Sequence, residues 1–313
     1  MNKIVAVLLA LAVCAGACFC FAGCDQAAGT KTDNFVVAVC QLMEHESLDK
    51  ATQGFQDALK AEMNKAGKKV TIDVQVAGGV DLCTTVVNAQ VSKRVDLIMA
   101  NATPALLAAA NATTTIPVLG TSVTDYNDTF KTGIPSNVTG TSDAVPFAEQ
   151  AQMMIDSLGL VAGDQVGVIY CTNESNSVVQ YNAVKALFEE KGIAVKAYTF
   201  SETTELQALV TTAATESKAI YVPSDNTVAD NDSVVGTICN EKKVPVYTSY
   251  GGKICYASLA IDYYQLGYET GVMAAQILLG EKKPADIAVK TLTPTVSYNK
   301  ELCGQLGITV PEN

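Results

Sequence analysis

The chain has 313 residues, and its 32 acidic and 21 basic side chains give a formal net charge of −11. Hydrophobic residues make up 49% of it and charged residues 17%. This composition excludes an intrinsically disordered protein, because such chains are poor in apolar residues. The acidic balance disfavours binding to nucleic-acid phosphates, which needs clustered Lys and Arg. The length is enough for about two domains of roughly 150 residues each.

The first 23 residues are typical of an export signal. Lys3 precedes an almost unbroken run of apolar and small residues over 4–22, and Gly23-Cys24 closes the run. Small residues directly before a Cys resemble a bacterial lipobox. The resemblance implies removal of a lipoprotein signal peptide (1–23), lipidation of Cys24, a linker over 24–33 and a lipid anchor on the extracytoplasmic face of the cell membrane. An ordinary signal peptide and a transmembrane anchor are the alternatives.

Six cysteines follow Cys24, and no two of them form a CxxC pair: Cys40, Cys83, Cys171, Cys239, Cys255 and Cys303. The chain has one His, so we expect no metal site. We expect no cofactor either. An even number of cysteines outside the cytoplasm permits disulfides, but this scattered spacing does not resemble a disulfide framework. We interpret these cysteines as small buried apolar residues and leave their pairing open.

Short β-branched runs alternate with segments of helical periodicity along the body of the chain. The strands and helices predicted in chain order are a strand at 36–41, a helix over 48–63, a strand at 70–76, a helix over 81–93, a strand at 95–100, a helix over 104–112, a strand at 116–120, a strand at 166–170, a helix ending at 191, and strands at 193–199, 219–223 and 244–248. The alternation predicts an α/β fold with two doubly wound parallel-sheet lobes. The strands are apolar throughout, as expected when helices cover both faces of a sheet.

The two halves of the body resemble each other weakly, and shared α/β patterning is the alternative explanation. Residues 37–47 correspond to 166–176, and 98–104 correspond to 220–226, so that Thr103 corresponds to Asp225. Ligands of open α/β sheets bind outside the carboxyl ends of the strands. Two such lobes therefore present matched loops across one cleft.

Complementary polar groups lie in these loops. Thr103-Pro104 is typical of a helix start, and the free N–H groups of a helix N-terminus bind carboxylate or phosphate. Ser122 follows the next strand and adds a hydroxyl for the same anion. On the other lobe, Asp225, followed by Asn226, is suited to hold an ammonium. Together these groups suit a zwitterionic amino acid. The alternatives are ordinary helix caps at Thr103 and Asp225 and a turn residue at Ser122.

The search for catalytic motifs favours a protein that is not an enzyme. The sequence contains no GxGxxG after a strand, no phosphate-loop lysine, no GxSxG and no HExxH. His45, with Glu44, Glu46 and Asp49 nearby, has the surroundings of a general base, but no nucleophile signature accompanies it. We interpret His45 as a polar contact.

Six segments resemble the tryptophan/tyrosine-type substrate-binding family of ABC transporters. They are VCQLMEHESLD (39–49), ATPA (102–105), TSVTD (121–125), NVTGTSD (137–143), PSDNTV (223–228) and IDYYQLG (261–267). The resemblance extends over about residues 35–310. It departs from the family at Glu46, where Pro is usual, and at 171–173, where Asn-Pro-Gly is usual.

The resemblance implies a periplasmic-binding-protein type I fold whose lobes are joined by three crossovers near 137–142, 260–263 and 292–294. Lobe one then comprises 34–140 plus 264–292, and lobe two comprises 141–262 plus 293–313. The implied function is an extracytoplasmic receptor that binds an aromatic L-amino acid (Trp, Tyr or Phe) by hinge closure. We expect it to act as a monomer and to deliver the ligand to ABC permease subunits. The alternatives are a sensing domain for a signalling receptor and a binding protein for a branched-chain amino acid, sugar or nucleoside.

The expected ligand-binding residues are Glu44, His45, Thr103, Pro104, Ser122, Val123, Glu174, Ser175, Asp225, Asn226, Tyr250 and Asp262. Tyr250 either stacks on an aromatic ligand or belongs to the core. Asp262 serves the hinge or cleft floor, or it caps the helix that begins at Tyr263. Glu174 becomes the ammonium partner if Asp225 is a helix cap.

Overall fold

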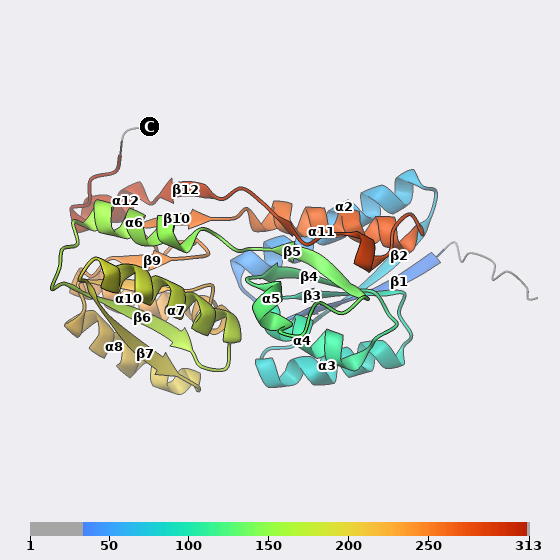
Figure 1. The fold of residues 1–313 in the computed structure, drawn as a ribbon, viewed down its shortest axis with the longest axis horizontal. Coiled ribbons are helices and arrows are strands. Elements are labelled where there is room, and N and C mark those ends of the chain that lie inside the picture. Colours follow the sequence, from blue (N-terminus) through green and yellow to red (C-terminus); the bar gives the residue numbers. More distant parts are fainter. Residues whose placement is uncertain (1–33, 312–313) are drawn as a thin grey trace, which may run out of the picture. The chain divides into compact units, whose positions relative to one another are not determined.

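The computed structural model describes residues 34–311, so the predicted signal peptide, Cys24 and linker lie outside the described residues. The described chain forms two six-stranded sheets with helices on both faces of each (Figure 1). We call the first sheet with its helices lobe one and the second sheet with its helices lobe two.

All strands of the sheet in lobe one are parallel. In spatial order they are β11 (Lys290–Thr291), β5 (Val138–Ser142), β4 (Val118–Val123), β3 (Leu97–Asn101), β1 (Asn34–Gln41) and β2 (Lys69–Val76). The helices of this lobe are α2 (Glu46–Lys65), α3 (Val80–Ser92), α4 (Thr103–Ala112), α5 (Tyr126–Thr129), α11 (Tyr263–Leu278) and η2 (Pro284–Asp286).

The sheet in lobe two is parallel except for its edge strand β12, which runs antiparallel to β10. In spatial order its strands are β12 (Thr295–Tyr298), β10 (Ala257–Ala260), β9 (Val246–Thr248), β8 (Ala219–Val222), β6 (Gln165–Cys171) and β7 (Ala194–Phe200). The helices are α6 (Phe147–Leu158), α7 (Ser175–Glu190), η1 (Thr203–Glu205), α8 (Leu206–Glu216), α9 (Asn226–Asp230), α10 (Asp232–Lys242) and α12 (Lys300–Leu306).

Strand β1 shows why the central strands are apolar along their whole length. Successive side chains of a strand point to opposite faces of its sheet. Val37 and Val39 pack in the cluster that holds residues of α2 and α11, whereas Ala38 and Cys40 pack in the cluster that holds residues of α3 and α4. Both faces are buried, so no position in the middle of the strand is available for a polar residue.

Helices α2 and α11 lie unusually close together at Gly267. A Cβ atom at this position would collide with the backbone oxygen of Ala51, so only glycine permits the approach. The contact joins the second turn of α11, which follows a crossing between the lobes, to the second turn of α2. His45 is the N-cap residue of α2, so this packing also positions the site described below.

The predicted fold class is confirmed, and the two sheets share one topology. The order β2-β1-β3-β4-β5 in lobe one corresponds to β7-β6-β8-β9-β10 in lobe two. The chain passes between the sheets at 143–146, 261–262 and 292–294. Residues 138–142, expected within a crossover, are instead strand β5, and the first crossing follows them. The division into lobes at 140 and 264 stays a prediction.

Candidate ligand-binding site

A small cavity lies where the carboxyl ends of the strands of both sheets face each other. Its walls come from both lobes and from the crossings, and the lining residues are His45, Leu48, Ser122, Asp143, Ser224, Asp225, Asn226, Ala229, Tyr250 and Tyr263. We call it the inner cavity. Its volume is about 10 Å³, at the lower limit for one water molecule. The lobes are therefore closed around it.

A second space, the outer cavity, adjoins the inner one and shares His45, Ala229, Tyr250 and Tyr263 with it. Its volume is about 560 Å³, within the usual range of roughly 300–1,000 Å³ for small-molecule pockets. The remaining lining includes the first turn of α2, Asp232 of α10 and the crossing before α11.

Three buried polar atoms on the inner cavity lack a hydrogen-bond partner. They are Ser122 Oγ, Asp143 Oδ1 and Tyr250 OH, and Thr103 Oγ1 is a fourth such atom close by in lobe one. A buried polar group left unpaired costs about 1–3 kcal/mol, and native proteins contain few of them. Their concentration around one cavity indicates a site that is completed by a polar ligand.

The wall formed by lobe one suits an anion. Asn101 of β3 pairs with Thr121 of β4, so Thr103, which follows β3, and Ser122, near the end of β4, lie at neighbouring strand ends. Thr103 is the first residue of α4, with Pro104 next to it, and the free N–H groups and dipole of a helix N-terminus attract negative charge. Ser122 has φ 55°, a left-handed backbone conformation that is uncommon outside glycine and clusters at ligand sites.

Asp143 is the carboxyl group with a free oxygen facing this cavity. It follows β5 at the first crossing and is 6% exposed. Its Oδ2 accepts a hydrogen bond of 2.8 Å from Tyr263 OH, while Oδ1 has no partner. Burial raises the pKa of Asp143 above its usual value. A cation bound at Oδ1 would reverse that effect, because opposite charges favour the ionised carboxylate.

Asp225 caps helix α9, as the alternative reading of the sequence had it. Its Oδ1 accepts from Val228 N (2.9 Å), and its Oδ2 accepts from Cys171 N and Ser177 Oγ (both 2.7 Å). The side chain is fully buried, and burial together with the nearby charge of Glu174 raises its pKa. Both oxygens are thus used inside lobe two, although Asp225 also lines the inner cavity.

Glu174 lies beside Asp225 and is equally buried. Its Oε1 accepts from the backbone N and the Oγ1 of Thr227 (both 2.8 Å). Its Oε2 accepts from the backbone N (3.0 Å) and the Nδ2 (2.6 Å) of Asn226. These four donors at the start of α9 satisfy its charge, so Glu174 anchors the loop of lobe two and has no free oxygen for a ligand.

His45 connects the lobes directly. Its Nε2 lies 3.2 Å from Oδ1 of Asn226, which belongs to α9. Asn226 Nδ2 donates to Glu174, so its Oδ1 is the acceptor and His45 Nε2 carries the hydrogen. Burial lowers the pKa of His45, although the bond to Asn226 and the charges of Glu174, Asp49 and Asp230 act in the opposite direction. The closed lobes therefore favour the neutral imidazole.

We expect ligand affinity to fall as the pH falls below about 6.5, the ordinary pKa of an exposed His, because opening the lobes exposes His45 and restores that value. Closing the lobes on a protonated His45 then costs the release of a proton, so His45 opposes closure below about pH 6.5 and does not oppose it above. Calorimetric titration between about pH 5 and 8 measures this dependence. His45→Gln, whose amide still donates to Asn226, should flatten it. An unchanged slope in the variant would rule out His45 as its source.

The other predicted residues take different places. Val123 belongs to the core of lobe one, and Glu44 is exposed. Pro104 and Ser175 line a third space of about 320 Å³ between the lobes, outside the inner cavity. Asp262 lines the outer cavity, and its side chain caps α11 by accepting from Gln265 N (3.1 Å). Tyr263, which the sequence offers with Tyr264 and Tyr250 as a residue that stacks on an aromatic ligand or belongs to the core, lines both cavities. Sequence reasoning missed Asp143 as a site residue.

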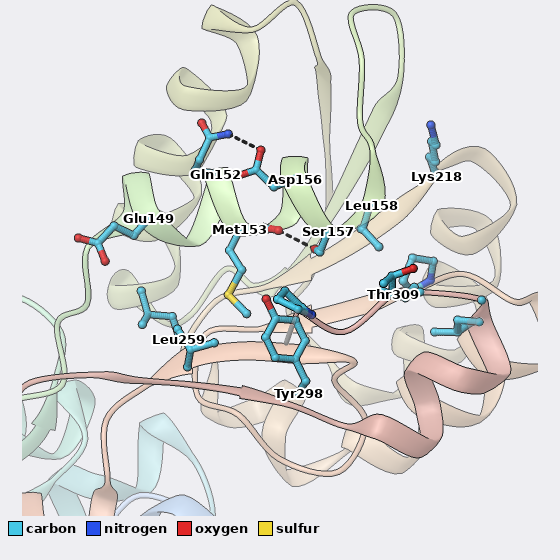
Figure 2. A pocket seen from close by; sticks show the side chains of 16 residues that line it. Glu149, Gln152, Met153, Asp156, Ser157, Leu158, Lys218, Leu259, Tyr298 and Thr309 are labelled. Carbon is cyan, nitrogen blue, oxygen red and sulfur yellow. Dashed lines mark hydrogen bonds between the residues drawn. The ribbon is translucent and has the colours of Figure 1, made fainter. Parts of the chain in front are cut away.

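A larger cavity, about 860 Å³, lies elsewhere, within lobe two. Figure 2 shows it between α6, with Gln152, Met153 and Asp156, and Tyr298 of β12. Gln152 Nε2 donates to Asp156 Oδ1 (2.8 Å). All of its lining comes from one lobe, and none of the unpartnered buried side-chain atoms described above lies on it. Closure of the lobes cannot enclose this groove, so it is not the candidate site.

The profile of the ABC transporter substrate binding protein family matches residues 36–313. The chain belongs to this family. A tyrosine-binding protein of Clostridioides difficile (strain R20291) is 34% identical to it over 294 residues, covering 87% of this chain and 84% of the relative. The substrate-binding protein therefore functions in ABC transport, on the extracytoplasmic side of the membrane. The task of this family is to bind a substrate for its transporter rather than to convert it.

This substrate-binding protein is similar to solved structures of a ligand-bound and of a ligand-free relative. A Streptococcus pneumonia domain in complex with L-Trp matches with a TM-score of 0.82 at 33% identity, over 89% of this chain and 96% of that one. A ligand-free, open protein from Clostridium difficile matches with a TM-score of 0.66 at 32% identity, over 89% and 97%. Identity and coverage are nearly equal for the two relatives, and the TM-score is higher for the one with a bound ligand. No helix within 34–311 is long and apolar enough to cross a bilayer.

Proposed function

We propose that this protein captures an aromatic L-amino acid as its zwitterion between the two lobes and delivers it to the permease subunits of an ABC importer. The observation that carries the proposal is the pair of unpartnered buried oxygens, Ser122 Oγ and Asp143 Oδ1, on one cavity between the lobes. One adjoins a helix N-terminus and the other belongs to a carboxyl group, so they select opposite charges. The relatives that bind tyrosine and L-Trp support the ligand class.

The ligand carboxylate binds to lobe one. Thr103 Oγ1 and Ser122 Oγ are the free side-chain groups there, and the first turn of α4 adds backbone N–H groups. This assignment keeps the role that the sequence predicts for Thr103 and Ser122.

The ligand ammonium binds to Asp143 rather than to Asp225. Asp225 already accepts three hydrogen bonds from its own lobe, and Glu174 accepts five. Asp143 Oδ1 accepts none. Burying an unpaired ammonium costs several kcal/mol, so the site needs a carboxylate with a free oxygen.

The aromatic ring extends toward the outer cavity, where Tyr250, Tyr263 and Tyr264 contribute to the walls. Aromatic rings pack in offset or edge-to-face arrangements, which suits a ligand of this class. Tyr250 OH is buried without a partner, so it can pair with the phenol hydroxyl or the indole N–H of the ligand.

Binding requires the lobes to open and close. An inner cavity of about 10 Å³ cannot admit an amino acid while the lobes are closed. The three crossings act as the hinge, and the His45–Asn226 hydrogen bond across the cleft stabilises the closed form. The ligand shifts the equilibrium only by its preference for that form.

The ligand class is tested by thermal unfolding with L-Trp, L-Tyr and L-Phe against L-Leu, L-Ile and ribose. A ligand at 100 times its Kd should raise the free energy of unfolding by about 2.7 kcal/mol. We expect the aromatic amino acids to stabilise the protein most. Stabilisation by ribose, a nucleoside or a branched-chain amino acid alone would overturn the proposal.

We further propose that a lipid on Cys24 anchors the protein, as a monomer, on the outer face of the membrane. We expect intact-mass measurement of membrane-extracted protein to show loss of residues 1–23 and addition of a diacylglyceryl group. Cys24→Ala should remove both the lipid and the membrane association, while Cys303→Ala keeps them. A Cys24→Ala protein that still carries the lipid would contradict the assignment.

A further inference from the structure

A second side-chain hydrogen bond joins the lobes, at two residues outside the predicted site. Gln180 belongs to α7 of lobe two, and Thr124 directly follows β4 of lobe one. Gln180 Nε2 donates to Thr124 Oγ1 over 3.3 Å. Gln180 is 1% exposed and Thr124 is 4% exposed, so the bond is shielded from water. It adds to the bond between His45 and Asn226 described above.

The other end of the Gln180 amide holds the cavity wall of lobe two. Its Oε1 accepts from Ser224 N (3.0 Å). Ser224 lies between β8 and α9, directly before Asp225, and it lines the inner cavity. Since a backbone N–H only donates, the amide oxygen of Gln180 must face Ser224, and its NH₂ group must face Thr124. One side chain thus connects the cavity wall of lobe two to lobe one.

On lobe one, Thr124 lies beside both of the groups proposed to bind the charges of the ligand. It is two residues after Ser122, in the segment that follows β4. Its backbone oxygen accepts from Ser142 Oγ (3.0 Å), and Ser142 directly precedes Asp143 at the first crossing. The Gln180 bond therefore joins lobe two to the part of lobe one that carries Ser122 and Asp143.

We propose that Gln180 is a positioning residue that couples ligand capture to closure of the lobes. This role rests on the proposed function. The bond to Thr124 belongs to the closed form, where it holds the Ser224 wall against the segment with Ser122 and Asp143. Gln180 does not itself line the inner cavity, so it acts through Ser224 and Thr124. It therefore determines how long a ligand stays bound rather than which ligand is chosen.

The dissociation rate of L-tryptophan tests this role. The chain contains no Trp, so indole fluorescence reports the ligand alone when excess L-tyrosine displaces it. Thr124→Val removes the acceptor and keeps the bond from Ser224 N to Gln180. We expect dissociation about five-fold to a hundred-fold faster, because the closed form then buries an unpaired donor that the open form exposes to water. Thr124→Ser, which retains the hydroxyl, should keep the wild-type rate.

A double-mutant cycle separates this bond from any other effect of Thr124. Gln180→Met should also speed dissociation, and Thr124→Val should add little in that background, because both changes remove the same bond. Equal rates in the wild type and Thr124→Val, or effects of the two changes that simply add, would overturn the proposal.

Thr141→Val is the matched control for a purely structural effect. The Thr141 hydroxyl is also buried, but it is bonded within lobe one, to those of Thr270 (2.9 Å) and Thr121 (3.1 Å). We expect this change to lower the stability of the ligand-free protein and to leave the dissociation rate unchanged. If Thr141→Val speeds dissociation as much as Thr124→Val does, loss of stability explains both, and the role of Gln180 is excluded.

Failure of the proposed function would be visible in the wild type itself, which would then bind neither L-tryptophan nor L-tyrosine. In that case X-ray scattering of the ligand-free proteins tests the bond alone. A larger radius of gyration in Gln180→Met than in the wild type would support a bond that holds the lobes together. Equal radii would overturn it.

Discussion

Asp143→Asn should weaken the binding of an aromatic amino acid by about thirty-fold to several-thousand-fold, measured by calorimetric titration. Losing one partner of a buried charge pair costs about 2–5 kcal/mol, and every 1.4 kcal/mol is tenfold in Kd. Asn retains the shape, and its carbonyl oxygen still accepts from Tyr263 OH, so the variant removes mainly the charge that faces the inner cavity.

The same variant should leave the ligand-free protein as stable as the wild type, or make it more stable. Burial raises the pKa of Asp143, which means that the fold penalises its ionised form. Asp262→Asn is the matched control, because Asp262 is an exposed acid on the outer cavity and should affect affinity little. Wild-type affinity in Asp143→Asn, or a large loss of apo stability, would show that Asp143 is not the ammonium partner.

Glu174→Gln should lower the free energy of unfolding of the ligand-free protein by about 2–4 kcal/mol, since buried donors left without an acceptor carry their full desolvation cost. The new amide group would face Asn226 N and Asn226 Nδ2, which are both donors. If Asn226 turns its amide to compensate, it loses the acceptor for His45, and affinity also falls. Denaturant unfolding and titration measure the two effects.

The negative charge of Glu174 raises the pKa of Asp225. Glu174→Gln removes this charge, and the gain offsets part of the loss in the free energy of unfolding. The control is Glu44→Gln, which removes the same charge from the matching loop of lobe one at an exposed position. We expect it to change neither stability nor affinity appreciably. If Glu174→Gln unfolds like the wild type and only affinity falls, Glu174 faces the ligand and the assignment of Asp143 must be reconsidered.

Much of the fold follows from the sequence because central strands buried on both faces must be apolar. The predicted strands at 36–41 and 166–170 agree with β1 and β6. The runs at 116–120 and 244–248 begin too early, since Pro117 and Pro245 cannot donate to a sheet and the strands start after them. Strand β5 escaped prediction because it is Val-Thr-Gly-Thr-Ser, and its buried Thr141 is paired with Thr121 and Thr270 through hydroxyls.

The site was harder to predict than the fold. Sequence reasoning placed the anion wall at Thr103 and Ser122, because a helix start after a strand is a local signal. It selected Asp225, with Glu174 as the alternative, and overlooked Asp143, because a helix cap and a ligand carboxylate use the same residue type. The two residues differ in their hydrogen bonds: both carboxylate oxygens of Asp225 accept from donors of the protein, whereas Asp143 Oδ1 accepts from none. Asp143 could have been predicted from its position, because it directly follows strand β5 where the chain crosses between the lobes.

The central claim, that both charges of an amino acid are bound between the lobes, is tested most directly by titrating three ligands. L-Tyrosine, tyramine and 3-(4-hydroxyphenyl)propionate share one ring, and the last two lack the carboxylate and the ammonium respectively. We predict that the wild type binds L-tyrosine at least about thirty-fold more tightly than either analogue, by the same charge-pair cost. We also predict that Asp143→Asn abolishes the preference over the propionate alone. Equal affinities for all three ligands in the wild type would contradict the account.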